Sequence, residues 1–151
     1  MTDSKRESCM ATLATNLAEI KVNAGYETDV STVERWIKAP DMNALDYTKF
    51  PLVIVEEGGE TIDYQPGRVD LCQMTPRLRL YLTGESSYPD AEDLNALIGD
   101  VRKCLADDIR LTDNAISCEA TAVSVDVSAD HPYAQAIVDL SITYENDDST
   151  P

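Results

Sequence analysis

Apolar residues recur along this chain with two different periods, and the period indicates which element each segment forms. Near the start, four apolar residues follow one another at three- and four-residue steps: Met10, Leu13, Leu17 and Ile20. Such a stripe is typical of a helix with one buried side. Ser4 and Glu7 have the spacing of a capping box, and Gly25 stands where a glycine commonly ends a helix. We therefore predict a first helix from Lys5 to Ala24.

A second helical stripe occurs in the later half of the chain, at Leu94, Leu97, Ile98, Val101 and Leu105. Pro89 and Asp90 suit the start of a helix, because proline needs no amide partner there and the helix dipole favours a negative charge. We predict a second helix from Asp90 to Asp107.

Other apolar segments alternate with a period of two or run continuously, which indicates strands. Before the second helix we expect strands within Tyr26–Lys38 and over Pro51–Val55, Thr61–Tyr64 and Leu78–Leu82. The continuous run over Pro51–Val55 indicates a strand that is covered on both faces. Glycines 58 and 59 can turn the chain, so that Thr61–Tyr64 pairs back on the preceding strand.

Two more strands are expected after the second helix. Val123, Val125 and Val127 share a face of the first, and a turn over Ser128–Pro132 leads into the second. The second has the most regular alternation in the chain, with one face formed by Ala134, Ala136, Val138, Leu140, Ile142 and Tyr144.

The predicted order is helix, three or four strands, helix and two strands. Because the strands cluster instead of alternating with helices, this order favours an α+β fold. We predict a mainly antiparallel mixed sheet with both helices packed on one face. One domain accounts for residues 1–145, and residues 146–151 form a flexible acidic tail.

The charge balance narrows the range of partners. The chain of 151 residues has 12 Lys and Arg against 28 Asp and Glu, a net charge of −16. Such a surface repels phosphate and anionic lipid, so nucleic-acid readout and membrane binding are disfavoured. No segment has the apolar length of a membrane span, and the polar start contains no apolar signal region. We expect synthesis in a cytoplasm.

The sequence contains few residues of the types that form catalytic or metal-binding sites. The single histidine, His131, falls in a predicted turn and lacks partner ligands at metal-site spacing. The four cysteines, Cys9, Cys72, Cys104 and Cys118, are widely separated and are interpreted as small core residues. No nucleotide-binding loop or nucleophile motif occurs. We predict no enzymatic activity, no catalytic or metal site and no cofactor.

The whole chain resembles the tail terminator family of long-tailed phages, which includes the minor tail protein U and related tail-completion proteins. The resemblance rests on the opening helix that ends in residues 23–30, on the 51–58 segment, on Leu78–Leu82 with the helix after it, and on the closing residues 140–145. It implies a hexameric ring of identical chains in the virion, at the head-proximal end of the tail. The ring ends tube polymerisation, binds the tube protein and the head connector, and lets DNA pass through its lumen without sequence-specific contact.

A ring needs a contact between two different patches of neighbouring copies. The segment from Glu57 to Pro76 is long for a connection inside a compact domain, so we predict that it projects as one of these patches. The candidate interface residues are Thr61, Ile62, Asp63, Tyr64, Gln65, Arg68 and Asp70. A surface loop without a partner is the alternative for this segment.

Other functions are compatible with the same sequence. An acidic DNA mimic or inhibitor that binds a basic partner would also carry a large negative charge. Another head–tail joining protein or an assembly chaperone would share the size and the element order. A small enzyme with an acidic site is disfavoured by the missing motifs.

Overall fold

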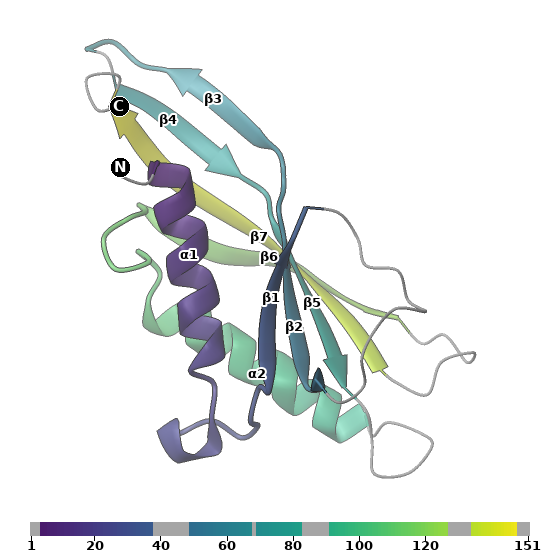
Figure 1. The fold of residues 1–151 in the computed structure, drawn as a ribbon. Helices are drawn as coiled ribbons and strands as arrows, with labels where there is room; N and C mark the ends of the chain where they lie inside the picture. The colour runs from purple at the N-terminus through teal and green to yellow at the C-terminus, as the bar shows by residue number, and fades with distance from the viewer. Residues whose placement is uncertain (1–3, 38–48, 68, 83–90, 127–133, 148–151) are drawn as a thin grey trace.

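A computed structural model describes residues 4–37, 49–67, 69–82, 91–126 and 134–147. The elements follow in the order α1 (Lys5–Ala18), a 3-10 helix (Val22–Ala24), β1 (Thr32–Trp36), β2 (Leu52–Glu56), β3 (Glu60–Tyr64), β4 (Val69–Met74), β5 (Arg77–Leu82), α2 (Ala91–Asp107), β6 (Ser117–Asp126) and β7 (Ala134–Asp147). Two α-helices and one seven-stranded mixed sheet in these described ranges confirm the predicted α+β class (Figure 1).

The sheet is organised around β7, which is 14 residues long. One edge of β7 pairs antiparallel with β5 over residues 134–139 and then with β4 over residues 142–147. Its other edge pairs with β6. The sheet continues from β5 through β2 to β1, a parallel pair, and from β4 to β3. It therefore divides into two arms, and β1, β3 and β6 are its outer strands.

The prediction that Thr61–Tyr64 pairs back on the preceding strand is wrong. β3 pairs with β4, placing Ile62 opposite Cys72, while β2 pairs with β5. The chain changes arms at Gly58, where a Cβ atom would lie 2.0 Å from the carbonyl oxygen of Thr75. Only a residue without a side chain allows this close crossing. The described part of the chain before α2 also contains five strands instead of three or four, because Val69–Met74 forms a strand.

Both helices pack on one face of the sheet, as predicted. Their buried residues share one core with the sheet, including Leu13 and Leu17 of α1, Leu97 and Val101 of α2, and Val53, Leu80, Val138 and Leu140 of the sheet. Burial of each such side chain contributes about 1.5–3 kcal/mol. On the opposite face, Phe50, Leu52, Ile54 and Tyr81 form a smaller cluster. β2 is therefore covered on both faces, which its continuous apolar run predicted.

The first helix begins as predicted and ends earlier. Ser4 Oγ accepts a hydrogen bond from the Glu7 amide at 3.1 Å, which confirms the N-terminal cap. The α-helix stops at Ala18 instead of Ala24, because the chain folds back at Val30 and binds a backbone carbonyl that a longer helix would use for its own hydrogen bond. The Ile20 carbonyl accepts from the Val30 amide at 2.9 Å, and this tertiary bond ends the helical pattern.

Side chains of α2 hold the segment that follows the first helix. Asp100 is 5% exposed. Its carboxylate accepts from the amide of Thr28 at 2.7 Å, from the amide of Glu27 at 3.1 Å, and from the Thr28 hydroxyl. One turn later, Lys103 donates to the Gly25 carbonyl at 2.9 Å. These bonds fix the loop that joins the 3-10 helix to β1.

The connection from α2 to β6 contains three consecutive residues with left-handed backbone: Leu111 (φ 47°), Thr112 (φ 56°) and Asp113 (φ 66°). For residues with a side chain this conformation costs about 1–2 kcal/mol each. Asp108 offsets part of this cost by accepting from the Thr112 amide at 2.9 Å. That bond also lowers the pKa of the Asp108 carboxyl.

The domain extends past the predicted boundary at residue 145, because β7 continues to Asp147. Residues 148–151 of the predicted tail lie outside the described residues, as do Asp90, Val127 and the predicted 128–132 turn with His131. Ala136, Val138, Leu140, Ile142 and Tyr144 are all buried, which confirms the inward face of the last strand.

Candidate interaction surface

The β3–β4 hairpin extends past the first turn of α1 (Figure 1). Five of the predicted interface residues are exposed at this end: Thr61, Ile62, Asp63, Tyr64 and Gln65. Asp70, on β4, is 7% exposed and therefore contributes little to an open surface. Arg68 lies outside the described residues.

Ile62 and Tyr64 make the end of β3 apolar. Ile62 is 47% exposed and Tyr64 is 76% exposed. Both side chains lie on the same face of the strand, because Ile62 is opposite the buried Cys72 and Tyr64 is opposite Asp70. The outer edge of β3 pairs with no described strand. A free strand edge with exposed apolar residues is a typical site for protein association.

The base of the hairpin is fixed to α1. Arg6 donates to the carbonyl of Gly58 at 2.7 Å and lies 3.5 Å from the Glu57 carboxylate and 3.4 Å from that of Glu60. The hydroxyl of Tyr144, on β7, donates to the same Glu60 carboxylate. Direct contacts thus hold the hairpin at its root while leaving its far end exposed.

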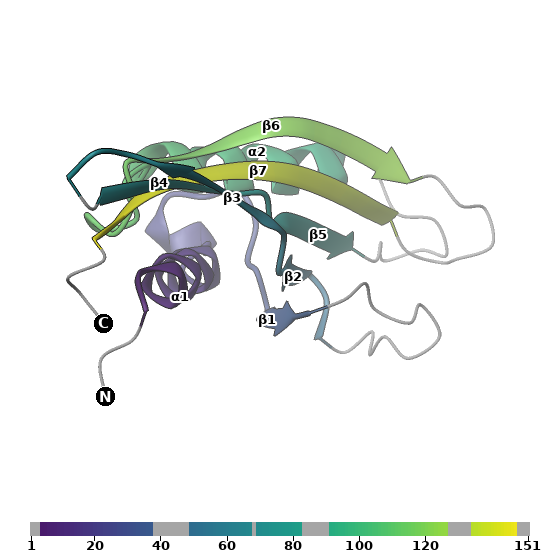
Figure 2. The ribbon, with the colours of Figure 1, turned by 90° about the horizontal axis from the view of Figure 1, so that it is seen from above.

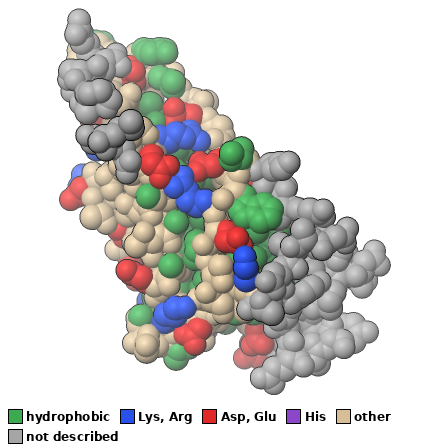
Figure 3. Space-filling view, in the orientation of Figure 1, with side chains coloured by type: hydrophobic (Ala, Val, Ile, Leu, Met, Phe, Trp, Pro, Cys, Tyr) green, Lys and Arg blue, Asp and Glu red, His purple; other side chains and the backbone are tan. Residues whose placement is uncertain are grey.

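A second arginine extends this charged cluster to β1. Arg35 binds both oxygens of Glu7 at 2.6 and 3.0 Å and one oxygen of Glu57 at 2.6 Å. The Glu7 and Glu57 hydrogen bonds raise the pKa of Arg35, and the Arg35 bond lowers the pKa of Glu7. Basic and acidic side chains are interleaved on this face of the molecule (Figure 3). The cluster joins α1, β1 and the hairpin.

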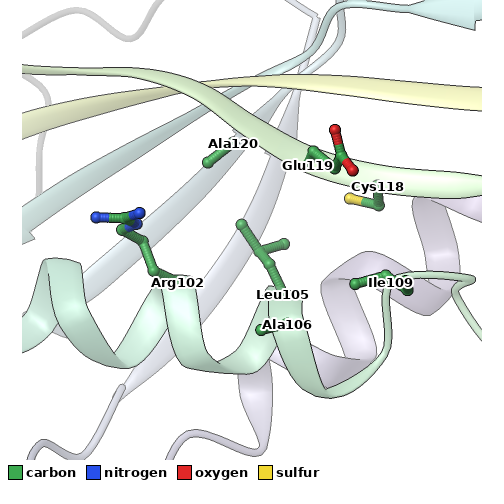
Figure 4. A pocket seen from close by; sticks show the side chains of 7 residues that line it. All are labelled: Arg102, Leu105, Ala106, Ile109, Cys118, Glu119 and Ala120. Carbon is green, nitrogen blue, oxygen red and sulfur yellow. The ribbon is translucent and has the colours of Figure 1, made fainter.

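Figure 2 shows α2 running alongside β6. A groove lies between these two elements, away from the charged cluster, with a cavity volume of about 180 Å³ (Figure 4). Its walls come from Arg102, Leu105, Ala106 and Ile109 of the α2 segment and from Cys118, Glu119 and Ala120 of β6. Ala106 and Ala120 are small, which leaves space between helix and strand. The lining is mainly apolar, with one cation and one carboxylate.

The exposed half of β6 continues from this groove. Val123 and Val125 are 41% and 48% exposed. They lie opposite Val138 and Ala136, so they share the helix-covered face of the sheet. A register shift between Ala120 and Ala122 precedes them. Like β3, β6 has an outer edge that pairs with no described strand.

The thiols are poor nucleophiles. All four cysteines are free and buried, as the sequence indicated. Burial raises the pKa of Cys9 and of Cys104 to about 11 and that of Cys118 to about 12. Almost no thiolate is present at neutral pH, and the thiolate is the reactive form. Within the described ranges, no three His, Cys, Asp or Glu side chains are grouped as metal ligands.

The chain matches no protein-family model and no curated protein sequence. None of the helices in the described part of the chain has the length and apolar character needed to cross a membrane.

Sequence reasoning identified the hairpin and missed the groove. The hairpin was found because its polar segment is long and contains turn residues. The groove depends on which side of α2 meets β6, and the alternation over Val123–Val127 gave no sign that this strand is at an edge. Ala106 and Ala120 were the available signal, but small residues are common in buried helices and strands as well.

Proposed function

We propose that this chain is a structural virion protein that forms a ring, a homo-hexamer, at the head-proximal end of a phage tail tube. The ring ends polymerisation of the tube protein and presents a surface to the head connector. Support comes from the resemblance in element order and from an α+β architecture whose sheet has exposed edges on different sides of the molecule.

The observation that carries the proposal is the anchored hairpin. Contacts of Arg6, Glu60 and Tyr144 hold the hairpin at its root. Its far end exposes Ile62 and Tyr64. A projection that is rigid at the base and apolar at the end suits a contact with another subunit, because little ordering is needed on binding.

The charge suits passage of DNA through the lumen. Cations on the wall would bind phosphate, whereas an acidic wall repels it. This repulsion acts over about 8 Å at physiological ionic strength. A chain with a net charge of −16 therefore gives a surface along which DNA moves without being held.

The test is a tube-capping assay with tube protein encoded in the same genome. The wild-type chain should shorten tubes in proportion to its concentration, and negative-stain images should show a ring at one end only. A double variant, Ile62→Ser with Tyr64→Ala, should lose ring formation and capping while keeping the circular dichroism spectrum of the wild type.

Val22→Ser is the matched control, because Val22 is 55% exposed on the 3-10 helix, outside the hairpin. It should cap tubes as the wild type does. Tubes that grow to full length with the wild-type chain present would refute the proposal. Stoichiometric binding to a basic nucleic-acid-binding protein would then support the acidic inhibitor instead.

A further inference from the structure

The face of β3 that exposes Ile62 and Tyr64 begins at Glu60, the first residue of the strand. Glu60 lies opposite Met74, a buried core residue. Ile62 lies opposite Cys72, which is also buried. Because alternate residues of a strand share a face, Glu60, Ile62 and Tyr64 point to the helix-covered side of the sheet. Glu60 is partly buried, whereas the four residues after it are exposed. The way in which Glu60 is held therefore affects where the exposed apolar side chains point.

Backbone pairing alone does not set the tilt of β3 towards the helices. β3 pairs with β4 over residues 60–64, and the Gly59 carbonyl accepts from the Thr75 amide at 3.1 Å. The other edge of β3 pairs with no described strand. These bonds lie within the sheet, and the twist between neighbouring strands varies over a wide range. A contact from the helix layer is needed to hold β3 in one orientation.

Arg6 makes such a contact from the first turn of α1 (Figure 1). Its Nη1 atom lies 3.4 Å from Glu60 Oε1. Its Nη2 atom donates to the Gly58 carbonyl at 2.7 Å and lies 3.5 Å from Glu57 Oε2. The Tyr144 hydroxyl donates to the same Glu60 oxygen from β7, which keeps the carboxylate in place for Arg6. One guanidinium therefore contacts three acceptors around the start of the hairpin, as its planar fork of donors allows.

We propose that Arg6 is a positioning residue for the β3 surface: it ties Glu60 to α1 and so sets the direction in which Ile62 and Tyr64 face. A surface that is already held in its binding direction loses less freedom on association, and its affinity is higher for that reason. The consequence for ring formation rests on the proposed function, whereas the position of β3 is a property of the single chain.

Arg35 provides a matched control, because it belongs to the same charged cluster and has a different set of partners. It binds Glu7 and Glu57, and none of its hydrogen bonds or ion pairs with described residues reaches β3. Loss of either arginine leaves the cluster with three carboxylates and one cation. Only loss of Arg6 leaves Glu60 without its cation, and repulsion between carboxylates then moves β3 away from α1. Arg35→Met removes the same charge and keeps the contact between Arg6 and Glu60.

Distances between two spin labels measure the position of β3 in solution. Asp63→Cys and Ala18→Cys place one label on β3 and one on α1, both at exposed positions. The four native cysteines are buried, so the reagent attaches to the introduced pair. Dilution with unlabelled chain excludes distances between copies. Double electron–electron resonance should give a narrow distribution for the labelled chain with both arginines. Arg6→Met should broaden this distribution and shift it to longer distances, and Arg35→Met should leave it narrow.

Two further measurements separate positioning from stability. In urea unfolding, Arg6→Met and Arg35→Met should lose stability to a similar extent, since each removes a partly exposed arginine with two carboxylate partners. In the tube-capping assay, at least about tenfold more of Arg6→Met than of Arg35→Met should be needed to shorten tubes. The conservative Arg6→Lys should restore part of the label distance and of the capping, because an ammonium keeps the charge and lacks the planar fork.

An unchanged label distance in Arg6→Met would overturn the positioning role, and so would an equal broadening in Arg35→Met. If Arg6→Met does not fold, Arg6→Lys decides, and a distribution identical to that of the chain with both arginines would count against the role. If Arg6→Met moves β3 but the wild-type chain caps no tube, the positioning role stands and the proposed function is wrong. If Arg6→Met moves β3 and caps tubes as the wild type does, assembly does not depend on the direction of this surface.

Discussion

Substitution of the adjacent glycines 58 and 59 tests how closely the start of the β3–β4 hairpin packs against the backbone of Thr75 and Pro76. A Cβ atom on Gly58 would lie 2.0 Å from the Thr75 oxygen, 2.4 Å from its carbon and 2.7 Å from the Pro76 nitrogen. All three are backbone atoms, so the two crossing segments must separate. Overpacking of this kind costs about 1–3 kcal/mol or more. Separation also strains the Arg6 bond to the Gly58 carbonyl, where a charged hydrogen bond contributes about 1.5–3 kcal/mol.

We therefore expect Gly58→Ala to lower the free energy of unfolding by about 3–5 kcal/mol. A Cβ atom on Gly59 would meet no atom within 4 Å, and the backbone there is not left-handed. Gly59→Ala should thus be neutral or stabilising by up to about 1 kcal/mol, because it restricts the unfolded chain.

Urea unfolding followed by circular dichroism measures both variants under the same conditions. For a domain of this size, the loss in Gly58→Ala corresponds to a fall in Tm of about 6–20 °C. A Gly58→Ala variant that loses less than about 1 kcal/mol relative to the wild type would show that the crossing is looser than described. Equal losses in both variants would show that the effect is general to the segment and not due to the Thr75 contact.

Three further predictions concern other anchored groups. Asp100→Ala should destabilise the fold by about 3 kcal/mol in urea unfolding, because it leaves buried amides without an acceptor, whereas the exposed Asp107→Ala should change stability by less than about 0.5 kcal/mol. Asp113→Gly should stabilise by about 1 kcal/mol in the same assay, since glycine adopts φ 66° without strain; a loss would show that the side chain itself is needed. The hydrogen bond from Arg35 lowers the pKa of Glu7 below its ordinary value of 4.5. The ionised Glu7 therefore stabilises the folded state above pH 4.5, and this stabilisation is lost as the pH falls through the lowered pKa of the folded state. Unfolding at pH 6 and pH 3 should therefore show a smaller acid-induced loss for Glu7→Gln than for the wild type.

Local patterns predicted both helices, most of the strands and the fold class, but they missed β4 (Val69–Met74). Helical stripes gave the buried faces of α1 and α2, and alternation gave the inward face of β7. The pairing of the strands and the end of α1 depended on contacts between residues far apart in the sequence, which local patterns do not predict. The end of α1 is set by a bond between Ile20 and Val30, and the path of β3 is set by the crossing of Gly58 over Thr75. The hairpin was predicted from its length, whereas the groove arises from the packing of α2 beside β6.

The central position of β7 has a consequence for synthesis of the protein. β4, β5 and β6 are made first, yet each depends on β7 for an edge partner. A nascent chain that has emerged only as far as residue 133 has three strands whose backbone groups lack their partner on β7. Its core also lacks the buried side chains of β7. The two arms therefore become one sheet only when β7 has left the ribosome. Until then the unpaired strand edges leave the chain open to misassociation with other chains.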